Sequence, residues 1–183
     1  MDVNFTYQEA AKKEPVRIEQ VFAEKPGGGL VENPTFDAPA TTAVGEKNGK
    51  YALIKAYRLV AAVAAGDTTI SIAKGSGVAV GDIIATGKKG VACTKVDTTA
   101  EDKDVVTVTL GVEIANGKVL YQAKAASADA AEPLLAPVFV TGNMVYANKG
   151  DQGVRLINGA NLRKETANIA SEVAALLPTI QLV

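Results

Sequence analysis

The chain has 183 residues, which fits one domain or a small domain with an arm. Its 19 basic and 20 acidic residues are spread along the sequence and give a net charge of −1, so a basic surface for nucleic acid is not expected. The absence of histidine removes the commonest general base and the commonest transition-metal ligand. No signal peptide and no membrane span is expected, because the charge-free run 133–148 is short and interrupted by Pro137 and Gly142.

Residues 1–50 are predicted to form an extended N-terminal arm. They contain four of the seven prolines and a glycine run at 27–29, a composition that disfavours helix and adds flexibility. Within them only 15–22 (PVRIEQVF) alternates well enough for a short strand, with Val16, Ile18 and Val21 on one face. We expect this segment either to be unstructured alone or to order against another surface.

Residues 51–125 are predicted to form a β-rich body. The stretch 51–65 fits either helix or strand, and strand is favoured because the segments that follow are short, β-branched and separated by turn residues. Further strands are expected in 67–73, 81–87, 90–96, 104–114 and 119–125, with an Asn116-Gly117 hairpin turn before the last. This spacing of turns indicates a small barrel or sandwich.

The glycine-rich stretch AKGSGVAVGD, residues 73–82, could turn the chain or bind a phosphate. Its glycines at 75, 77 and 81 miss the dinucleotide-binding spacing, and no helix-forming sequence follows to receive an anion. The sequence KPGGGL at 25–30 likewise lacks the ending of a phosphate-binding loop. We therefore predict that residues 73–82 form a turn.

Residues 126–183 are predicted to form a strand-helix-strand region packed on the body, within the same domain. An apolar run precedes a helix over 161–177, which Asn161 would cap and Pro178 would stop, and TIQLV would form a terminal strand. The helix would place its apolar side chains on one face: Leu162, Thr166, Ile169, Val173 and Leu176. The predicted fold class is thus α+β and mainly β, with one C-terminal helix and an extended N-terminal arm.

No catalytic, cofactor-binding or metal-binding residue is predicted. Cys93 has strand-like neighbours and is expected to be a buried thiol rather than a nucleophile activated by Lys95. The carboxylates at 101–104 fit a solvated turn. An enzyme is therefore not expected, and a core built on alanine and valine favours a protein that works by contact and oligomerisation.

The sequence over residues 50–183 resembles the head-decoration proteins of tailed bacteriophages. Ala126, Asp129, the run 133–140 and the residues 141–144 (TGNM) hold the places of that family's pattern. The N-terminal PVRIEQVFAEKPGGGL is similar to capsid-attached head fibre proteins of phages and prophages in Bacteroides-like gut bacteria. The resemblance implies a virion protein on the capsid surface, made in the cytoplasm of a bacterial host, with no cofactor, nucleic-acid or membrane partner.

The resemblance also implies a homotrimer bound to the major capsid protein, decorating the head or forming the base of a head fibre. The arm would add a strand to the shell, with Arg17 and Glu19 setting its register. The implied capsid contacts are Val16, Arg17, Ile18, Glu19, Val21 and Phe22, for which an ordinary first strand of the domain is the alternative. The implied trimer contacts are Leu134, Leu135, Val138, Phe139 and Val140, for which a core strand of the single chain is the alternative.

A carbohydrate-binding surface module is a second functional hypothesis. Such sites present aromatic platforms, and the sequence has no tryptophan. The residues that could supply platforms are Tyr51, Tyr57, Tyr121 and Tyr146.

Overall fold

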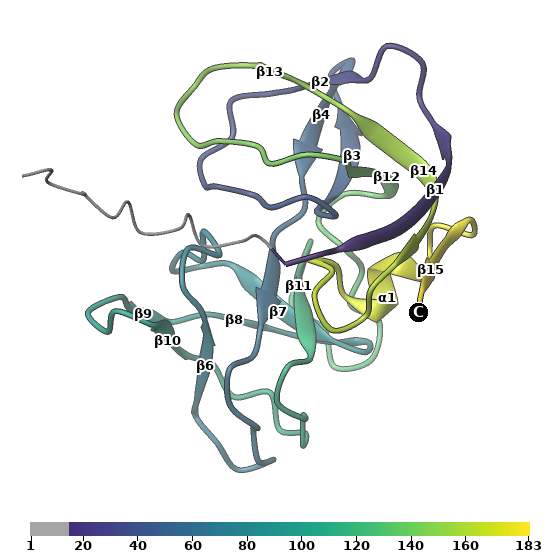
Figure 1. Ribbon diagram of the computed structural model, residues 1–183. Coiled ribbons are helices and arrows are strands. Elements are labelled where there is room, and N and C mark those ends of the chain that lie inside the picture. The colour runs from purple at the N-terminus through teal and green to yellow at the C-terminus, as the bar shows by residue number, and fades with distance from the viewer. Residues whose placement is uncertain (1–14) are drawn as a thin grey trace, which may run out of the picture.

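The computed structural model describes residues 15–183, so the first 14 residues of the predicted arm lie outside the described part. The described chain is mainly β, as the turn spacing predicted, and it has one short helix near the C-terminus. Its strands form one curled sheet in the upper half of Figure 1 and two smaller sheets below it.

The large sheet has eight strands and joins the two ends of the described chain. Its path runs β1 (Ile18–Glu24), β14 (Leu156–Leu162), β12 (Pro137–Thr141), β3 (Ala43–Lys47), β4 (Lys50–Leu53), β2 (Gly29–Val31) and β13 (Gln152–Val154). The terminal strand β15 (Ile180–Leu182) pairs in parallel with β14, which confirms the strand predicted for TIQLV. This sheet therefore combines strands from residues 18–53 with strands from the last quarter of the sequence.

The two smaller sheets use residues 56–123. One has the order β5 (Ala56–Arg58), β11 (Val119–Ala123), β7 (Ile83–Thr86) and β8 (Lys89–Ala92). The other has the order β6 (Thr69–Ala73), β10 (Lys103–Thr107) and β9 (Lys95–Asp97). The strands predicted in 67–73, 81–87 and 119–125 are thus present, although each is shorter than the apolar run that suggested it. The segments 51–65 and 90–96 were each expected to be one strand, but each is divided between two strands that belong to different sheets.

Three apolar clusters fill the spaces between these sheets. One packs β14, β15 and the C-terminal helix against β11 and β7, with Leu162, Tyr121 and Val173 buried. A second lies between the two small sheets around Tyr57, Leu120 and Cys93. The third lies within the curl of the large sheet, where Tyr51 and Phe139 make an edge-to-face contact at 5.7 Å. Cys93 is free and only 2% exposed, which confirms the expected buried thiol, and burial raises its pKa.

The helix predicted over 161–177 is wrong in most of its length. The observed helix α1 spans only Ser171–Ala174, and residues 156–162 are strand β14. Asn161 is not a helix cap, because it lies in β14 opposite Gln20 and Gln181, and the N-cap of α1 is Ala170. Residues 161–162 lie in β14, whose pairing with β1, β12 and β15 overrides their local helical preference. Residues 163–170 are turns and irregular chain that lead from β14 to α1.

The predicted hairpin at Asn116-Gly117 is also wrong, although the chain does turn there. The strand expected over 104–114 ends at Thr107, and β11 pairs with β5 and β7 instead of β10. Gly111 interrupts the apolar run with a φ of 66°, a conformation that is easy for glycine. As a result Val112 is 37% exposed, while Leu110 and Ile114 are buried.

Candidate functional site

The edge strand β1 carries the residues that the resemblance assigned to capsid contact. It pairs antiparallel with β14, and no other strand of the described chain pairs with it. Ile18 and Val21 pack against the core, whereas Phe22 is 55% exposed. Val16 was expected on the same face, but it precedes the strand and is 52% exposed. A register shift between residues 18 and 20 lets Ile18 and Val21, three positions apart, both pack inward.

Two ion pairs fix β1 against β14 at its two ends. Glu19 pairs with Arg163, just beyond the end of β14, and Glu24 pairs with Arg155, just before its start. Arg163 N also donates to Arg17 O at 2.9 Å. The four charged side chains are each more than a third exposed, so each pair adds little stability and mainly sets which residues face each other.

The apolar run assigned to trimer contact lies mostly in the chain's own core. Leu135 and Val140 belong to the cluster under β14, and Val138 and Phe139 pack on the cluster within the large sheet. Leu134 is 37% exposed. The structure thus gives four of these residues intrachain neighbours, and a contact with a second copy stays a prediction.

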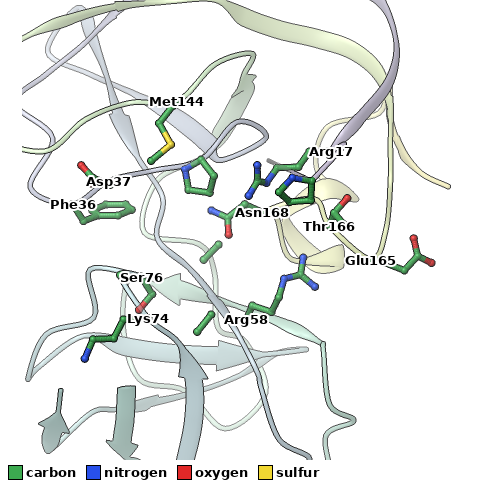
Figure 2. Close-up of a pocket in the computed structure, with 15 residues that line it drawn as sticks. Arg17, Phe36, Asp37, Arg58, Lys74, Ser76, Met144, Glu165, Thr166 and Asn168 are labelled. Atoms are coloured by element: carbon green, nitrogen blue, oxygen red, sulfur yellow. The ribbon is translucent and has the colours of Figure 1, made fainter. Parts of the chain in front are cut away.

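A cavity of about 570 Å³ opens where the chain enters β1, between the large sheet and the small sheets (Figure 2). Its wall combines residues that are far apart in the sequence. Pro15 and Arg17 come from the entry to β1, and Arg58 comes from the end of β5. The loop after β14 contributes Glu165, Thr166 and Asn168. Phe36, Met144 and the loop 74–76 complete it.

Two guanidinium groups lie at one end of the cavity. Arg58 donates to Gly117 O at 2.9 Å and to Ala167 O at 2.5 Å, which fixes its position. Partial burial lowers the pKa of Arg58, the positive charge of Arg17 lowers it further, and Glu165 opposes both effects. Figure 2 shows Arg17, Arg58, Thr166 and Glu165 on one side and Phe36, Asp37 and Met144 on the other. The cavity therefore has a cationic end and a more apolar end.

The glycine-rich loop forms part of this wall and acts as a turn, as predicted. Gly75, Gly77 and Gly81 all have φ between 70° and 92°. At Gly77 a Cβ atom would lie 2.4 Å from Cγ of Phe36, so only glycine fits beside that ring. Lys74 donates from Nζ to the Thr98 and Ala100 carbonyls and pairs with Asp104 at 3.0 Å. The Lys74 ammonium group is therefore bonded to neighbouring groups of the chain.

A buried polar cluster lies around Asp82 at the end of the same loop. Its Oδ2 accepts from Lys55 Nζ at 2.8 Å, Tyr57 OH at 3.0 Å and Ala79 N at 2.9 Å, and its Oδ1 accepts from Gln122 Nε2 at 3.0 Å. Burial, and next the charge of Asp82, raise the pKa of Tyr57 far above its usual value. Both carboxylate oxygens accept hydrogen bonds from neighbouring groups of the fold. The cluster therefore joins β5, β11 and the loop and does not present a reactive group.

Three of the four tyrosines named for the carbohydrate hypothesis are buried. Tyr51, Tyr57 and Tyr121 are at most 7% exposed, and Tyr146 is 53% exposed. Tyr121 OH donates to Gly87 O at 2.8 Å and to Ala131 O at 3.0 Å, so its polar end is used within the fold. This burial leaves Tyr146 alone of the four as a candidate platform.

The sequence did not reveal the cavity. Arg17 and Arg58 are 41 positions apart; Arg17 was expected to contact a capsid and Arg58 was assigned no role. Among residues 15–183 no group of three or more His, Cys, Asp and Glu side chains could hold a metal ion. Within the same range, no helix has the length and apolar character needed to cross a bilayer.

Comparisons with known proteins gave no match. No protein-family model matches this chain, and searches of curated proteins and of solved structures also found nothing similar.

Proposed function

We propose that this chain is a structural protein of a tailed-phage head, which attaches to the capsid surface as a trimer and decorates the head or forms the base of a head fibre. The observation that best supports the proposal is strand β1, a seven-residue edge strand paired on one side only in the described chain. An unpaired edge offers backbone donors and acceptors to a strand of another protein. The exposed Phe22 side chain adds an apolar contact beside that edge.

Two features of the fold agree with attachment through β1. The strand is held by its backbone pairing with β14 and by the packing of Ile18 and Val21 on the core, so its outer edge is in place before a partner arrives. The register shifts along β1 make that edge irregular, which disfavours indiscriminate pairing between copies. A partner strand would need a matching irregularity, and this requirement gives specificity.

Sedimentation with purified capsids tests attachment. We expect the wild-type chain to sediment with capsids of its phage and Phe22→Asp to lose at least about tenfold in affinity, because a charge would replace the apolar contact. Leu176→Asp is the matched control, since Leu176 is 54% exposed and lies after α1, away from β1 in sequence. Equal binding by the two variants would contradict attachment through β1.

Light scattering on the eluting protein tests the trimer independently. We expect a mass of three chains, each of 18.8 kDa, in the absence of capsids. A monomer over the whole concentration range would contradict the trimer while leaving capsid attachment to be judged by sedimentation.

A further inference from the structure

We propose that a second cavity, lined by Lys55 and Gln122, binds a neutral carbohydrate. This Gln122 cavity has a volume of about 380 Å³ and lies between strands β3 and β4 of the large sheet and strand β11 of a small sheet. The loop 32–36 and Leu134 complete its wall. The described residues that line it do not include any of β1, so the proposal does not depend on capsid attachment or on trimer formation.

The inner wall of the Gln122 cavity carries hydrogen-bonding groups that the fold positions without using all of their capacity. Lys55 Nζ donates to Asp82 Oδ2 at 2.8 Å, which leaves two of the three N–H donors of the ammonium group. Gln122 Nε2 donates to Asp82 Oδ1 at 3.0 Å, which leaves one N–H donor and the amide oxygen. Both side chains are therefore held by one carboxylate that is itself only 11% exposed.

The amide oxygen of Gln122 is open to a ligand. Among residues 15–183 it accepts no hydrogen bond, and it is not one of the buried side-chain atoms that lack a partner, so water reaches it. A ligand hydroxyl at this oxygen would replace a bond to water by one to a fixed acceptor. Because Asp82 already orders the amide, the entropic cost of binding is lower than for a free surface glutamine.

The charged groups of the Gln122 cavity compensate one another. Lys55 pairs with the buried Asp82 at 2.8 Å. Lys47, at the end of β3, pairs with Glu32 at 3.9 Å. A charged ligand would lose part of its hydration here without meeting an unpaired opposite charge, so a neutral polar ligand is favoured.

A hydroxyl group both donates and accepts hydrogen bonds, and the cavity wall offers partners of both kinds. Lys55 donates, Glu32 accepts, and the Gln122 amide does both. Leu134 is 37% exposed and Phe36 is half-buried, so they present apolar surface to the C–H groups on the face of a sugar ring. The volume is near the lower limit for small-molecule sites, which suits one or two sugar units.

The Gln122 cavity differs from the tyrosine platforms considered in the sequence. Among the described residues that line it there is no tyrosine. Tyr57 contributes indirectly, because its hydroxyl donates to Asp82 at 3.0 Å and helps to fix the carboxylate that holds Lys55 and Gln122. Recognition would therefore depend on hydrogen bonds more than on aromatic stacking.

Nuclear magnetic resonance titration of the full chain tests the proposal, with the methyl glycosides of glucose, galactose, mannose and N-acetylglucosamine as probes. We expect at least one of them to cause saturable shifts of the backbone amides of Asn33, Phe36 and Gln122, with a dissociation constant on the order of 10 mM for so small a probe. Cyclohexanol has a similar ring with a single hydroxyl and should cause no saturable shifts. Glucuronate carries a charge and should bind no more tightly than the glucoside.

Variants of the cavity wall make the test specific. Gln122→Leu should weaken binding of the glycoside about fivefold or more, because it removes a donor and an acceptor. Glu32→Ala should weaken binding about threefold, and it tests the site separately if Gln122→Leu does not fold. Glu46→Ala is the matched control for Glu32→Ala, since Glu46 is an exposed carboxylate of β3 outside the cavity wall and its loss should leave the affinity unchanged.

The proposal is overturned if none of the four glycosides causes saturable shifts, or if cyclohexanol shifts the same amides to the same extent. Tighter binding of glucuronate than of the glucoside would overturn the neutral class of ligand. Unchanged affinity in folded Gln122→Leu, or in Glu32→Ala where Gln122→Leu is unfolded, would overturn the site. Because the titration contains no capsid, these outcomes are independent of those that test attachment.

Discussion

Asp82 shows how a single side chain can connect separate strands. Its carboxylate is 11% exposed and accepts bonds from a lysine, a tyrosine, a glutamine and a backbone amide. A buried ion pair contributes little net free energy to folding, because the cost of desolvation offsets the attraction. Removing the carboxylate, however, leaves its donors buried without a hydrogen-bond partner.

Asp82→Ala should therefore lower the free energy of unfolding by about 3–5 kcal/mol. Asp129→Ala is the matched control, since Asp129 is exposed, and it should change the free energy by less than about 0.5 kcal/mol. Urea denaturation followed by circular dichroism measures both. A loss below about 1 kcal/mol for Asp82→Ala would mean that the cluster does not stabilise the fold.

The contact partners of the four arginines could not be predicted from the sequence. Arg155 and Arg163 flank β14 and pair with β1, while Arg17 and Arg58 line the cavity. None of these pairings follows from local spacing, because each joins segments more than 40 positions apart. The charges could be counted from the sequence, but their partners depend on the strand order of the large sheet.

At the scale of elements, period-two alternation and turn residues predicted most strands. β6 and β7 lie within their predicted segments, and the loop between them turns at glycines as expected. The prediction failed where local and tertiary preferences differ: residues 161–162 were expected to begin a helix but lie in β14, which pairs with β1, β12 and β15. Strand order in a sheet that mixes both ends of the chain could not be read from any local pattern.

The loop 73–82 allows a matched test of what its glycines do. Gly75 and Gly77 both have positive φ, at 79° and 70°, but a Cβ atom at Gly75 would meet nothing within 4 Å. A Cβ atom at Gly77 would lie 2.4 Å from Cγ and 2.5 Å from Cβ of Phe36, atoms near the base of the side chain that cannot easily move. An alanine at either position would therefore adopt an unfavourable positive φ, but only at position 77 would its Cβ atom also clash with Phe36.

Gly75→Ala should lower the free energy of unfolding by about 1–2 kcal/mol, the cost of the left-handed backbone for alanine. Gly77→Ala should cost about 1–3 kcal/mol more, because the ring of Phe36 must shift. Thermal unfolding of both variants measures the difference. If the two variants unfold at the same temperature, Phe36 does not pack against the loop as described.

At the scale of the whole molecule, the described chain is closed by pairing of its beginning with its end. β1 lies against β14 and β15 lies on the other side of the same strand, so residues 18–24, 156–162 and 180–182 form one continuous part of the large sheet (Figure 1). The sequence separated these segments into an arm and a C-terminal region. The structure gives the inner face of β1 a role in the core, and its outer edge has no paired strand among residues 15–183.

Adjacent residues of β1 can separate these two roles. Val21 packs against the core, and Val21→Asp should lower the free energy of unfolding by about 2 kcal/mol because it replaces a partly buried apolar side chain by a charge. Phe22 is 55% exposed, and Phe22→Asp should change that free energy by less than about 0.5 kcal/mol while weakening capsid sedimentation. Denaturation measures the stability of each variant, and sedimentation measures its capsid binding. If Val21→Asp is as stable as the wild type, β1 is not part of the folded core, and its pairing with β14 does not hold the strand in place for a partner.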